Sequence, residues 1–358
     1  MNALRTAVAA GSVLAGLLAW SGAALAQAVT VGPNGETAAA AASLMLSPAE
    51  VERMRAGHRR AALLWHTASD FTDSVSRGAQ DEFKRLGVAV IATTDAGFDA
   101  ARQKSDVETV LAKKPDIILS LPIDPVSAAE TFRRAKERGV KLVFLSNVPR
   151  GYRAGVDYVT IATDDLVGMG VAAADALAKA TGAQGEVAWL YHDADYYVTN
   201  QRDRAFKRRL QEKYPGLKIV VERGIADPAR AEEVTNALLA RYPALAGIYV
   251  PWAEPAEGVL AALRAAGNRK TRLVTLDLSE PLALDMVNNG NVVALVTDQA
   301  YALGQTMATA AAYGVLGKKI PPFLIVPAVT VTKANVGAAW REALHRDAPQ
   351  SVSAGAAK

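Results

Sequence analysis

The sequence has 358 residues, 51% of them hydrophobic, with 40 Lys and Arg side chains against 36 Asp and Glu. This length exceeds one usual domain and suffices for two compact α/β units. The charges are nearly balanced and spread along the chain, which favours a solvated surface over a nucleic-acid-binding patch. The chain has no cysteine, so disulfides, thiol nucleophiles, thiolate metal sites and a lipidation cysteine are excluded.

Residues 1–26 have the pattern of a secretory signal peptide. Arg5 gives a positive start, Ala7 to Trp20 is apolar, and Ala24-Leu25-Ala26 is an A-x-A cleavage site that precedes Gln27. A retained membrane anchor is the alternative interpretation, but the apolar run is short for a membrane span. An exported chain without a lipid anchor is expected to be soluble, most simply in a bacterial periplasm.

Residues 27–57 are expected to form an N-terminal extension with one short helix. The part up to Ala42 is rich in Ala, Gly and Thr and is expected to be loosely ordered. Ser47-Pro48-Ala49-Glu50 is typical of a helix start, with Ser as the N-cap and Pro at the first helical position. The helix is predicted to end near Ala56.

The next stretch predicts a strand, a helix and a second strand. Ala61 to Trp65 and Val88 to Ala92 are short apolar runs, typical of buried strands. Between them, apolar residues recur at spacings of four, four and three, which places them on one face of a helix. Thr72 or Asp70 is the expected cap of this helix, and Gly87 suits its end. This order predicts a parallel sheet, in which ligands bind outside the carboxyl ends of the strands.

The alternation of strands and helices continues to residue 332. Helices are predicted at 101–112, 125–138, 164–181, 200–214, 228–241, 255–266, 280–288 and 299–316. Strands are predicted at 116–121, 141–145, 158–162, 186–191, 217–221, 247–250, 272–276, 292–296 and 323–332. So many alternating elements demand doubly wound α/β layers, and two similar lobes, each a parallel sheet flanked by helices, are the simplest solution. The end of the chain, from Asp347, is expected to be disordered.

Polar and aromatic residues follow almost every predicted strand. These segments are 66–71, 122–124, 146–147, 192–197, 226–227, 251–254, 277–279 and 297–299. Carboxylates and amides bind hydroxyl groups in directional pairs, and flat aromatic faces cover the C–H side of a ring or chain. A cleft lined by such segments would suit a polyhydroxylated ligand.

The first predicted helix also carries a family resemblance. Its residues Ser74, Gly78, Ala79, Gln80 and Glu82 form the motif S-x-x-x-G-A-Q-x-E, after a strand and a short loop with an aromatic residue. This pattern resembles the start of a periplasmic ribose-type (type I) solute-binding protein of ABC sugar importers. The fold is shared with the ligand-binding core of lac-repressor-like regulators.

The resemblance covers His58 to Lys333 and implies two lobes joined by a three-segment hinge. The crossings would fall near 163–164, 298–299 and 326–327. Lobe 1 would then comprise 58–163 plus 299–326, lobe 2 would comprise 164–298 plus 327–333, and 334–358 would form a C-terminal tail.

Ligand contacts are implied position by position. In the first lobe, Ser69, Phe71 and Thr72 stand where the family has an amide and two stacking aromatics, so one aromatic is kept. Ser146-Asn147 replaces an acid–arginine pair that binds hydroxyls. The resemblance therefore implies the fold but does not imply ribose as the ligand.

In the second lobe, Arg202 and Asp277 match the family's arginine and aspartate. Ala226 stands in place of an aromatic, Trp252 in place of an amide, and Asp298 in place of the hinge glutamine. The expected ligand-binding residues are Ser69, Phe71, Asp124, Asn147, Asn200, Arg202, Trp252, Asp277, Asp298 and His66.

Other duties stay open for these residues. Trp252 could instead lie in the core or at the rim, Phe71 could lie in the core, Asp277 could cap a helix, and Arg202 could make a surface ion pair. Turn and cap duties account equally well for most of the remaining residues.

The leading hypothesis is a periplasmic substrate-binding component of an ABC importer, which traps a sugar, polyol or related carbohydrate by closure of its hinge. Its expected partner is the inner-membrane permease, and we expect a monomer with no cofactor, no metal ion and no nucleic acid. The alternatives keep the fold: a sensory receptor subunit, or a site that encloses a cationic amine. A sugar site would aim Arg202 and Asp277 at hydroxyls, whereas an amine site would leave Arg202 outside the pocket.

An enzyme and a transcription regulator are disfavoured. The four histidines lack metal-binding spacing, and the sequence has no nucleophile elbow, no P-loop and no dinucleotide-binding glycine motif after a strand. A regulator with this ligand core would need a helix-turn-helix headpiece, for which the sequence offers only one helix before the first strand.

Overall fold

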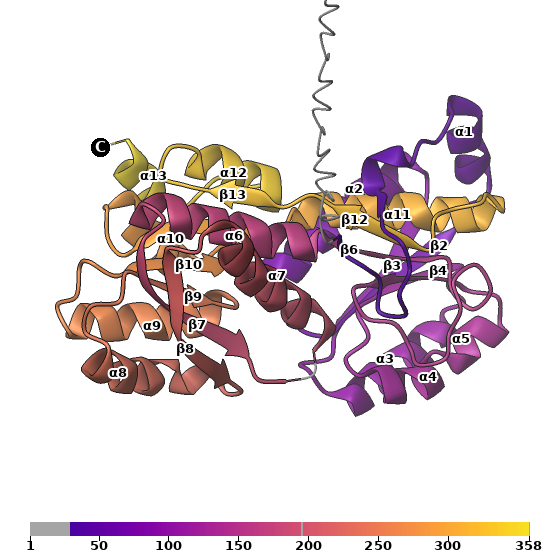
Figure 1. The fold of residues 1–358 in the computed structure, drawn as a ribbon. Coiled ribbons are helices and arrows are strands. Elements are labelled where there is room, and N and C mark those ends of the chain that lie inside the picture. Colours follow the sequence, from indigo (N-terminus) through magenta and orange to yellow (C-terminus); the bar gives the residue numbers. More distant parts are fainter. Residues whose placement is uncertain (1–28, 195, 358) are drawn as a thin grey trace, which may run out of the picture.

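The computed structural model describes residues 29–194 and 196–357, and the predicted signal peptide lies outside them. The chain forms two α/β lobes that lie side by side (Figure 1). The first sheet has the strand order β1-β12-β6-β5-β4-β2-β3, and the second has the order β13-β11-β10-β9-β7-β8. Both are parallel except where β13 pairs antiparallel with β11. The predicted fold of two doubly wound lobes is confirmed.

The first lobe is built on its seven-stranded sheet. The strands are β1 (Ala39–Ala40), β2 (Arg60–Trp65), β3 (Ala89–Asp95), β4 (Ile117–Ser120), β5 (Lys141–Leu145), β6 (Thr160–Asp164) and β12 (Phe323–Val326). The helices are η1 (Ala41–Ser43), α1 (Pro48–Ala56), α2 (Asp70–Arg85), α3 (Ala100–Ala112), α4 (Pro125–Thr131), α5 (Arg133–Glu137) and α11 (Ala300–Leu316).

The second lobe has the six-stranded sheet. Its strands are β7 (Gly185–His192), β8 (Leu217–Ile225), β9 (Gly247–Val250), β10 (Arg272–Leu276), β11 (Val292–Thr297) and β13 (Val329–Val331). Its helices are α6 (Leu166–Thr181), α7 (Tyr197–Lys213), η2 (Pro228–Arg230), α8 (Ala231–Arg241), α9 (Ala253–Ala265), α10 (Glu280–Val287), α12 (Val336–Leu344) and α13 (Gln350–Ala356).

Two predicted elements are divided in the structure. The strand expected at 323–332 is two strands, because the chain leaves the first sheet after Val326 and joins the second sheet at Val329. The helix expected at 125–138 is interrupted at Phe132, which ends α4 and precedes α5. Apolar periodicity continues through both interruptions, so it could not reveal them.

The predicted cap of α2 was wrong. Ser69, and not Thr72 or Asp70, is the N-cap, and its hydroxyl accepts a hydrogen bond from the Thr72 amide at 3.2 Å. Asp70 instead forms an ion pair with Arg346 from the end of the chain. The other cap predictions are confirmed: Ser47 and Glu50 form a capping box on α1.

The N-terminal extension is ordered where we expected loose structure. Thr30 is fully buried, and its hydroxyl donates to Asp165, the N-cap of α6, at 2.6 Å. Further along, β1 pairs with β12 at the border of the first sheet. The Ala, Gly and Thr residues of this segment allow it to lie close against the lobes. The prediction of loose order from their abundance was therefore wrong.

The C-terminal tail is also ordered, against expectation. It forms α12 and α13, in which Trp340 and Val352 are buried. The carbonyl of Leu344 accepts hydrogen bonds from Ser74 and Arg77 of α2, at 2.6 and 3.1 Å. In the second lobe, Ser351 donates to Glu280 of α10. The Ala and Ser residues of the tail are helix formers and surface residues of these packed helices.

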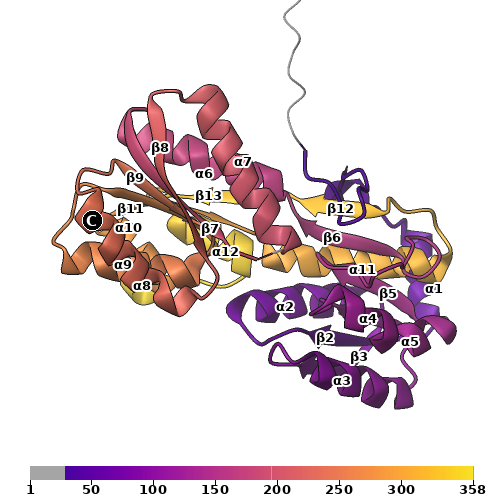
Figure 2. The ribbon, with the colours of Figure 1, turned by 60° about the horizontal axis from the view of Figure 1, so that its bottom comes forward.

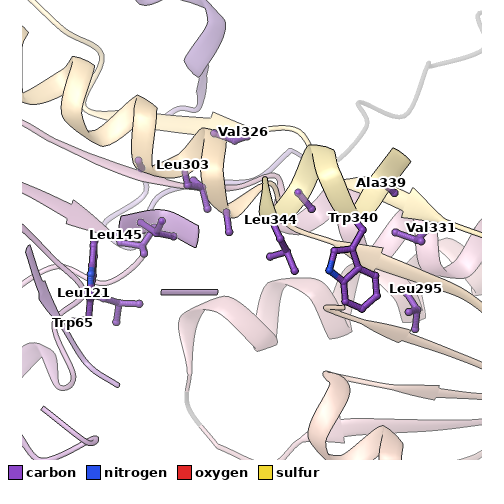
Figure 3. Close-up of a cluster of buried hydrophobic side chains, with 14 of the residues drawn as sticks. Trp65, Leu121, Leu145, Leu295, Leu303, Val326, Val331, Ala339, Trp340 and Leu344 are labelled. Carbon is purple, nitrogen blue, oxygen red and sulfur yellow. The ribbon is translucent and has the colours of Figure 1, made fainter. Parts of the chain in front are cut away.

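One apolar core runs through both lobes. Figure 3 shows Trp65, Leu121 and Leu145 of the first lobe in the same cluster as Leu295 and Trp340 beside the second sheet. In Figure 2, α12 lies between α11 and the second sheet, and its buried residues, among them Trp340 and Leu344, belong to the same apolar cluster. The C-terminal helices therefore belong to the core of the molecule.

Two glycines allow α2 and α11 to pack backbone against backbone. A Cβ at Gly78 would overlap the Tyr301 carbonyl, and one at Gly304 would overlap the Val75 carbonyl. We expect Gly78→Ala and Gly304→Ala each to lower the free energy of unfolding by about 1–3 kcal/mol, because the helices must separate. Gly337→Ala, which meets no atom within 4 Å, is the control and should be neutral or slightly stabilising. Urea unfolding would measure this; a similar loss in all three would contradict the close-packing argument.

Candidate functional site

A cluster of four charged residues lies where the chain passes between the sheets. We call Asp164, Arg202, Asp277 and Asp298 the hinge cluster. Asp164 ends β6, whereas Asp277 and Asp298 directly follow β10 and β11. Arg202 lies in the first turns of α7 and is buried, with one guanidinium nitrogen 3.3 Å from the Asp277 carboxylate. These are carboxyl ends of parallel strands, where ligands of such sheets bind.

Local backbone geometry presents Asp277 to this cluster. Its φ is +69°, a left-handed conformation that Asp tolerates better than most residues. It does not cap α10, whose N-cap is Ser279. Helix capping was the alternative role of Asp277 in the sequence analysis. In the structure Asp277 forms an ion pair with Arg202 and does not cap the helix.

The hinge cluster has unusual proton affinities. Burial raises the pKa of Asp164 to about 7, although Arg202 opposes the rise. Burial raises the pKa of Asp298 well above its ordinary value, and the carboxylates of Asp164 and Asp277 add to the effect. Burial also raises the pKa of Asp277, against the attraction of Arg202. One guanidinium therefore lies among three carboxyl groups, and the pKa of each carboxyl group is above its ordinary value.

Aromatic rings border the hinge cluster. The Trp252 and His192 rings meet edge to face with centroids 4.8 Å apart, and the Tyr196 ring lies 6.0 Å from His192. Burial, followed by the charge of Arg202, lowers the pKa of His192, which favours the neutral imidazole. A flat, uncharged surface therefore stands next to the charged groups.

Asn147 extends the site into the first lobe. It follows β5, is buried, and donates to the Pro122 carbonyl after β4 at 3.0 Å. Burial raises the pKa of Tyr196, and a hydrogen bond from the Asn147 side chain and the charge of Arg202 oppose this rise. Groups from both lobes thus meet at one place, as ligand capture between lobes requires.

The structure brings together five of the predicted site residues: Asn147, Arg202, Trp252, Asp277 and Asp298. Asn200 lies beside them and lines a cavity of about 400 Å³ with His192 and Asp203. A larger hollow of about 690 Å³ lies between the ends of α8 and α9 and contains none of the predicted residues.

The other four predicted residues lie at strand ends and helix starts of the first lobe, and three of them have structural duties. Ser69 and Asp124 are the N-caps of α2 and α4, and Phe71 packs partly against the core. His66 meets the exposed Phe98 ring edge to face at 5.0 Å, and burial lowers its pKa to about 4. No contact joins these residues to the hinge cluster in the described structure, so their ligand contacts stay predictions.

Sequence reasoning missed Asp164, His192 and Tyr196 as site residues. Asp164 is a charged residue at the carboxyl end of the buried run T-I-A-T, which is a usable signal for a site. His192 and Tyr196 stand in a strand-end segment whose polar and aromatic residues were expected to line a cleft, but neither was among the expected ligand-binding residues. Trp65, at the end of the first predicted strand, is a core residue whose indole N–H donates to Ser76 at 2.6 Å.

Residues 61–319 match the family described as "Periplasmic binding protein domain". The chain belongs to this family. Among its relatives are the ribose import binding protein of Bacillus subtilis, 27% identical over 72% of this chain and 81% of the relative, and the D-allose-binding periplasmic protein of Escherichia coli, 28% identical over 76% and 91%.

Solved structures of the same fold include the arabinose-binding protein AraP of Geobacillus stearothermophilus, with a TM-score of 0.71 and 21% identity over 78% of this chain and 98% of that one. A solute-binding protein of Agrobacterium vitis with bound tagatopyranose has a TM-score of 0.69 and 23% identity over 79% and 98%. At these identities, the structures support the fold of this periplasmic binding protein and nothing finer.

The described residues offer neither a membrane-spanning helix nor a metal-binding cluster. Within 29–194 and 196–357, no helix has the length and apolar character needed to cross a membrane. The same residues hold no group of three or more His, Asp or Glu side chains placed to bind a metal ion.

Proposed function

We propose that this periplasmic binding protein is the substrate-binding component of an ABC importer and captures a sugar, polyol or related carbohydrate. The observation that carries the proposal is the hinge cluster with Trp252 beside it. Directional donors and acceptors next to an apolar ring are what a polyhydroxylated ligand needs. Relatives named for ribose and allose support the same class of ligand.

Hinge closure is the proposed mechanism. Hydroxyls of the ligand would bind Arg202 and Asp277 from the second lobe and Asn147 from the first. Because such contacts form together only when the lobes approach, the ligand shifts the population towards the closed form. The inner-membrane permease would recognise that form. The export signal in residues 1–26 supports delivery of the mature chain to the periplasm.

Thermal unfolding of the chain from Gln27 with pentoses, hexoses, polyols and cyclitols tests this function. A ligand at a hundredfold excess over its Kd stabilises the folded state by about 2.7 kcal/mol. For a chain of this size we expect Tm to rise by roughly 3–5 °C. Trp252→Ala and Asp277→Asn should abolish the rise.

The matched control is Tyr242→Ala, which removes an aromatic ring at the end of α8, away from the hinge cluster. Its ligand-induced shift should equal that of the wild type, whatever its own Tm. The proposal fails if no carbohydrate of the panel changes Tm, or if the shift persists in both site variants.

A further inference from the structure

The hinge cluster has three acidic groups and one basic group. Asp164, Asp277 and Asp298 act on one another and on Arg202 through electrostatic interaction. The other titratable groups near Arg202 bring no cation: Asp203 and Tyr249 are acidic, and the shifts in the pKa values of His192 and Tyr196 favour neutral side chains. If all three carboxyl groups were ionised, two negative charges would be uncompensated; burial and the neighbouring carboxylates therefore raise the pKa values of Asp164 and Asp298, and a bound cation would take the place of their protons.

Two buried polar atoms of this cluster lack partners. Asp164 is 6% exposed, and its Oδ1 accepts no hydrogen bond from any described residue. Arg202 is 7% exposed, and its Nε donates to no acceptor in the same part of the chain. Asp298 accepts a long hydrogen bond from the Thr297 hydroxyl, at 3.4 Å. Buried polar groups without partners are costly, so each atom indicates a ligand group of the opposite kind.

We propose that the ligand is a carbohydrate or polyol that carries a protonated amine, such as an amino sugar or an amino polyol. Its ammonium group lies among the three carboxylates of the hinge cluster, and a neighbouring hydroxyl oxygen accepts from Nε of Arg202. This proposal rests on the proposed function and narrows its class of substrate.

An ammonium group fits this place better than a hydroxyl. It supplies three donors and a positive charge, whereas a hydroxyl supplies one donor and no charge. Charge-assisted hydrogen bonds in a buried site are about twice as strong as neutral ones. The Trp252 ring beside the cluster adds a surface that attracts cations.

The decisive test compares matched ligands that differ in the amine. Glucose, glucosamine and N-acetylglucosamine form one set, and glucitol and glucamine (1-amino-1-deoxyglucitol) form another; each is titrated at pH 7 and constant ionic strength with Tm as the readout. We expect the free amine of at least one set to bind on the order of tenfold tighter than its neutral members. N-acetylglucosamine controls for size, because acetylation removes the charge.

Two variants test whether the preference for the amine arises at the hinge cluster. Asp298→Asn and Asp164→Asn each remove one carboxylate and should reduce the preference for the amine by about tenfold. Glu212→Gln, at the exposed end of the same helix that carries Arg202, is the control for overall charge and should leave the preference within about twofold.

The outcomes separate this inference from the proposed function. Neutral members that bind as well as their amines, or better, overturn the inference and leave the carbohydrate function intact. An amine preference that persists in both Asn variants overturns the assignment to the hinge cluster. Absence of any shift with these ligands and with the whole panel of pentoses, hexoses, polyols and cyclitols contradicts the proposed function, and the inference falls with it.

Discussion

Replacing Arg202 with methionine is expected to lower the free energy of unfolding by about 3–5 kcal/mol at pH 7.5. Arg202 is buried and is the only cation of the hinge cluster. Methionine keeps much of the apolar volume of the side chain but leaves three carboxyl groups without a counter-charge. Removing one partner of a buried ion pair costs more than the pair itself contributes, because the other partner stays buried.

The stability that Arg202→Met loses should depend on pH, and the direction of this dependence follows from the pKa values of the hinge cluster. The pKa of Asp164 is raised from 3.8 to about 7, so the folded state binds the proton more tightly than the unfolded state. Such a group contributes stability that is present below pH 4 and is lost as the pH rises through 7. Without Arg202 the pKa values of all three carboxyl groups rise further, so the difference between variant and wild type should be smallest near pH 4 and grow towards pH 7.5.

Urea unfolding at pH 4.5, 6 and 7.5 would measure this difference. Lys207→Met is the matched control on the same helix, since Lys207 makes a partly exposed pair with Glu222 and lies over the Trp189 ring at 4.7 Å, and its loss should cost only about 1 kcal/mol. Asp164→Asn should have the opposite sign and stabilise the protein at pH 7.5. A loss in Arg202→Met that is equal at all three pH values would mean that the guanidinium acts through packing alone.

Replacing Trp340 with alanine is the second large effect. Trp340 is 2% exposed and lies in the apolar core that joins the lobes (Figure 3). Truncating a buried tryptophan leaves a cavity and is expected to cost about 3–5 kcal/mol. Trp340→Phe should cost much less, because the indole N–H has no hydrogen-bond partner among the described residues and a ring of similar shape remains.

Denaturant unfolding of the two variants against the wild type checks this prediction. Trp252→Ala serves as a second comparison, since Trp252 is only partly buried and its loss should affect ligand binding more than stability. If Trp340→Ala unfolded at the wild-type midpoint, α12 would be a surface attachment and not part of the core.

The fold was predictable because its signals are local. Apolar strands such as Lys141–Leu145 and Gly247–Val250 have the same bounds in the structure as in the sequence analysis. The capping box at Ser47 likewise fixed the start of α1. Strand alternation with helices then leaves few possible architectures.

The predictions that were wrong concern segments whose structure depends on contacts between residues far apart in the sequence. The tail after Asp347 has the composition of a disordered segment, yet Val352 is buried because α10 and α12 offer it a surface. Asp70 lost the capping role because Arg346, far away in sequence, pairs with it. No local pattern contains such partners.

The candidate site was predictable only in part, for the same reason. Arg202 and Asp277 were found by matching positions, and their ion pair is observed. The sequence could not show that Asp164 would join them, because its proximity arises from the crossing between the sheets. Nor could it show that Asp298 would be held beside two other carboxylates, since their separation along the chain exceeds any local motif.

The position of the C-terminal helices α12 and α13 has a consequence for how the ligand affinity of the protein can change in evolution. They connect both lobes, through α2 and α11 on one side and α10 on the other, without any residue of the hinge cluster. Any change there that favours one lobe arrangement multiplies the apparent affinity for every solute by the same factor. Substitutions around Trp340 would therefore raise or lower the affinity of the protein for all its solutes together, while its preference among those solutes stays the same.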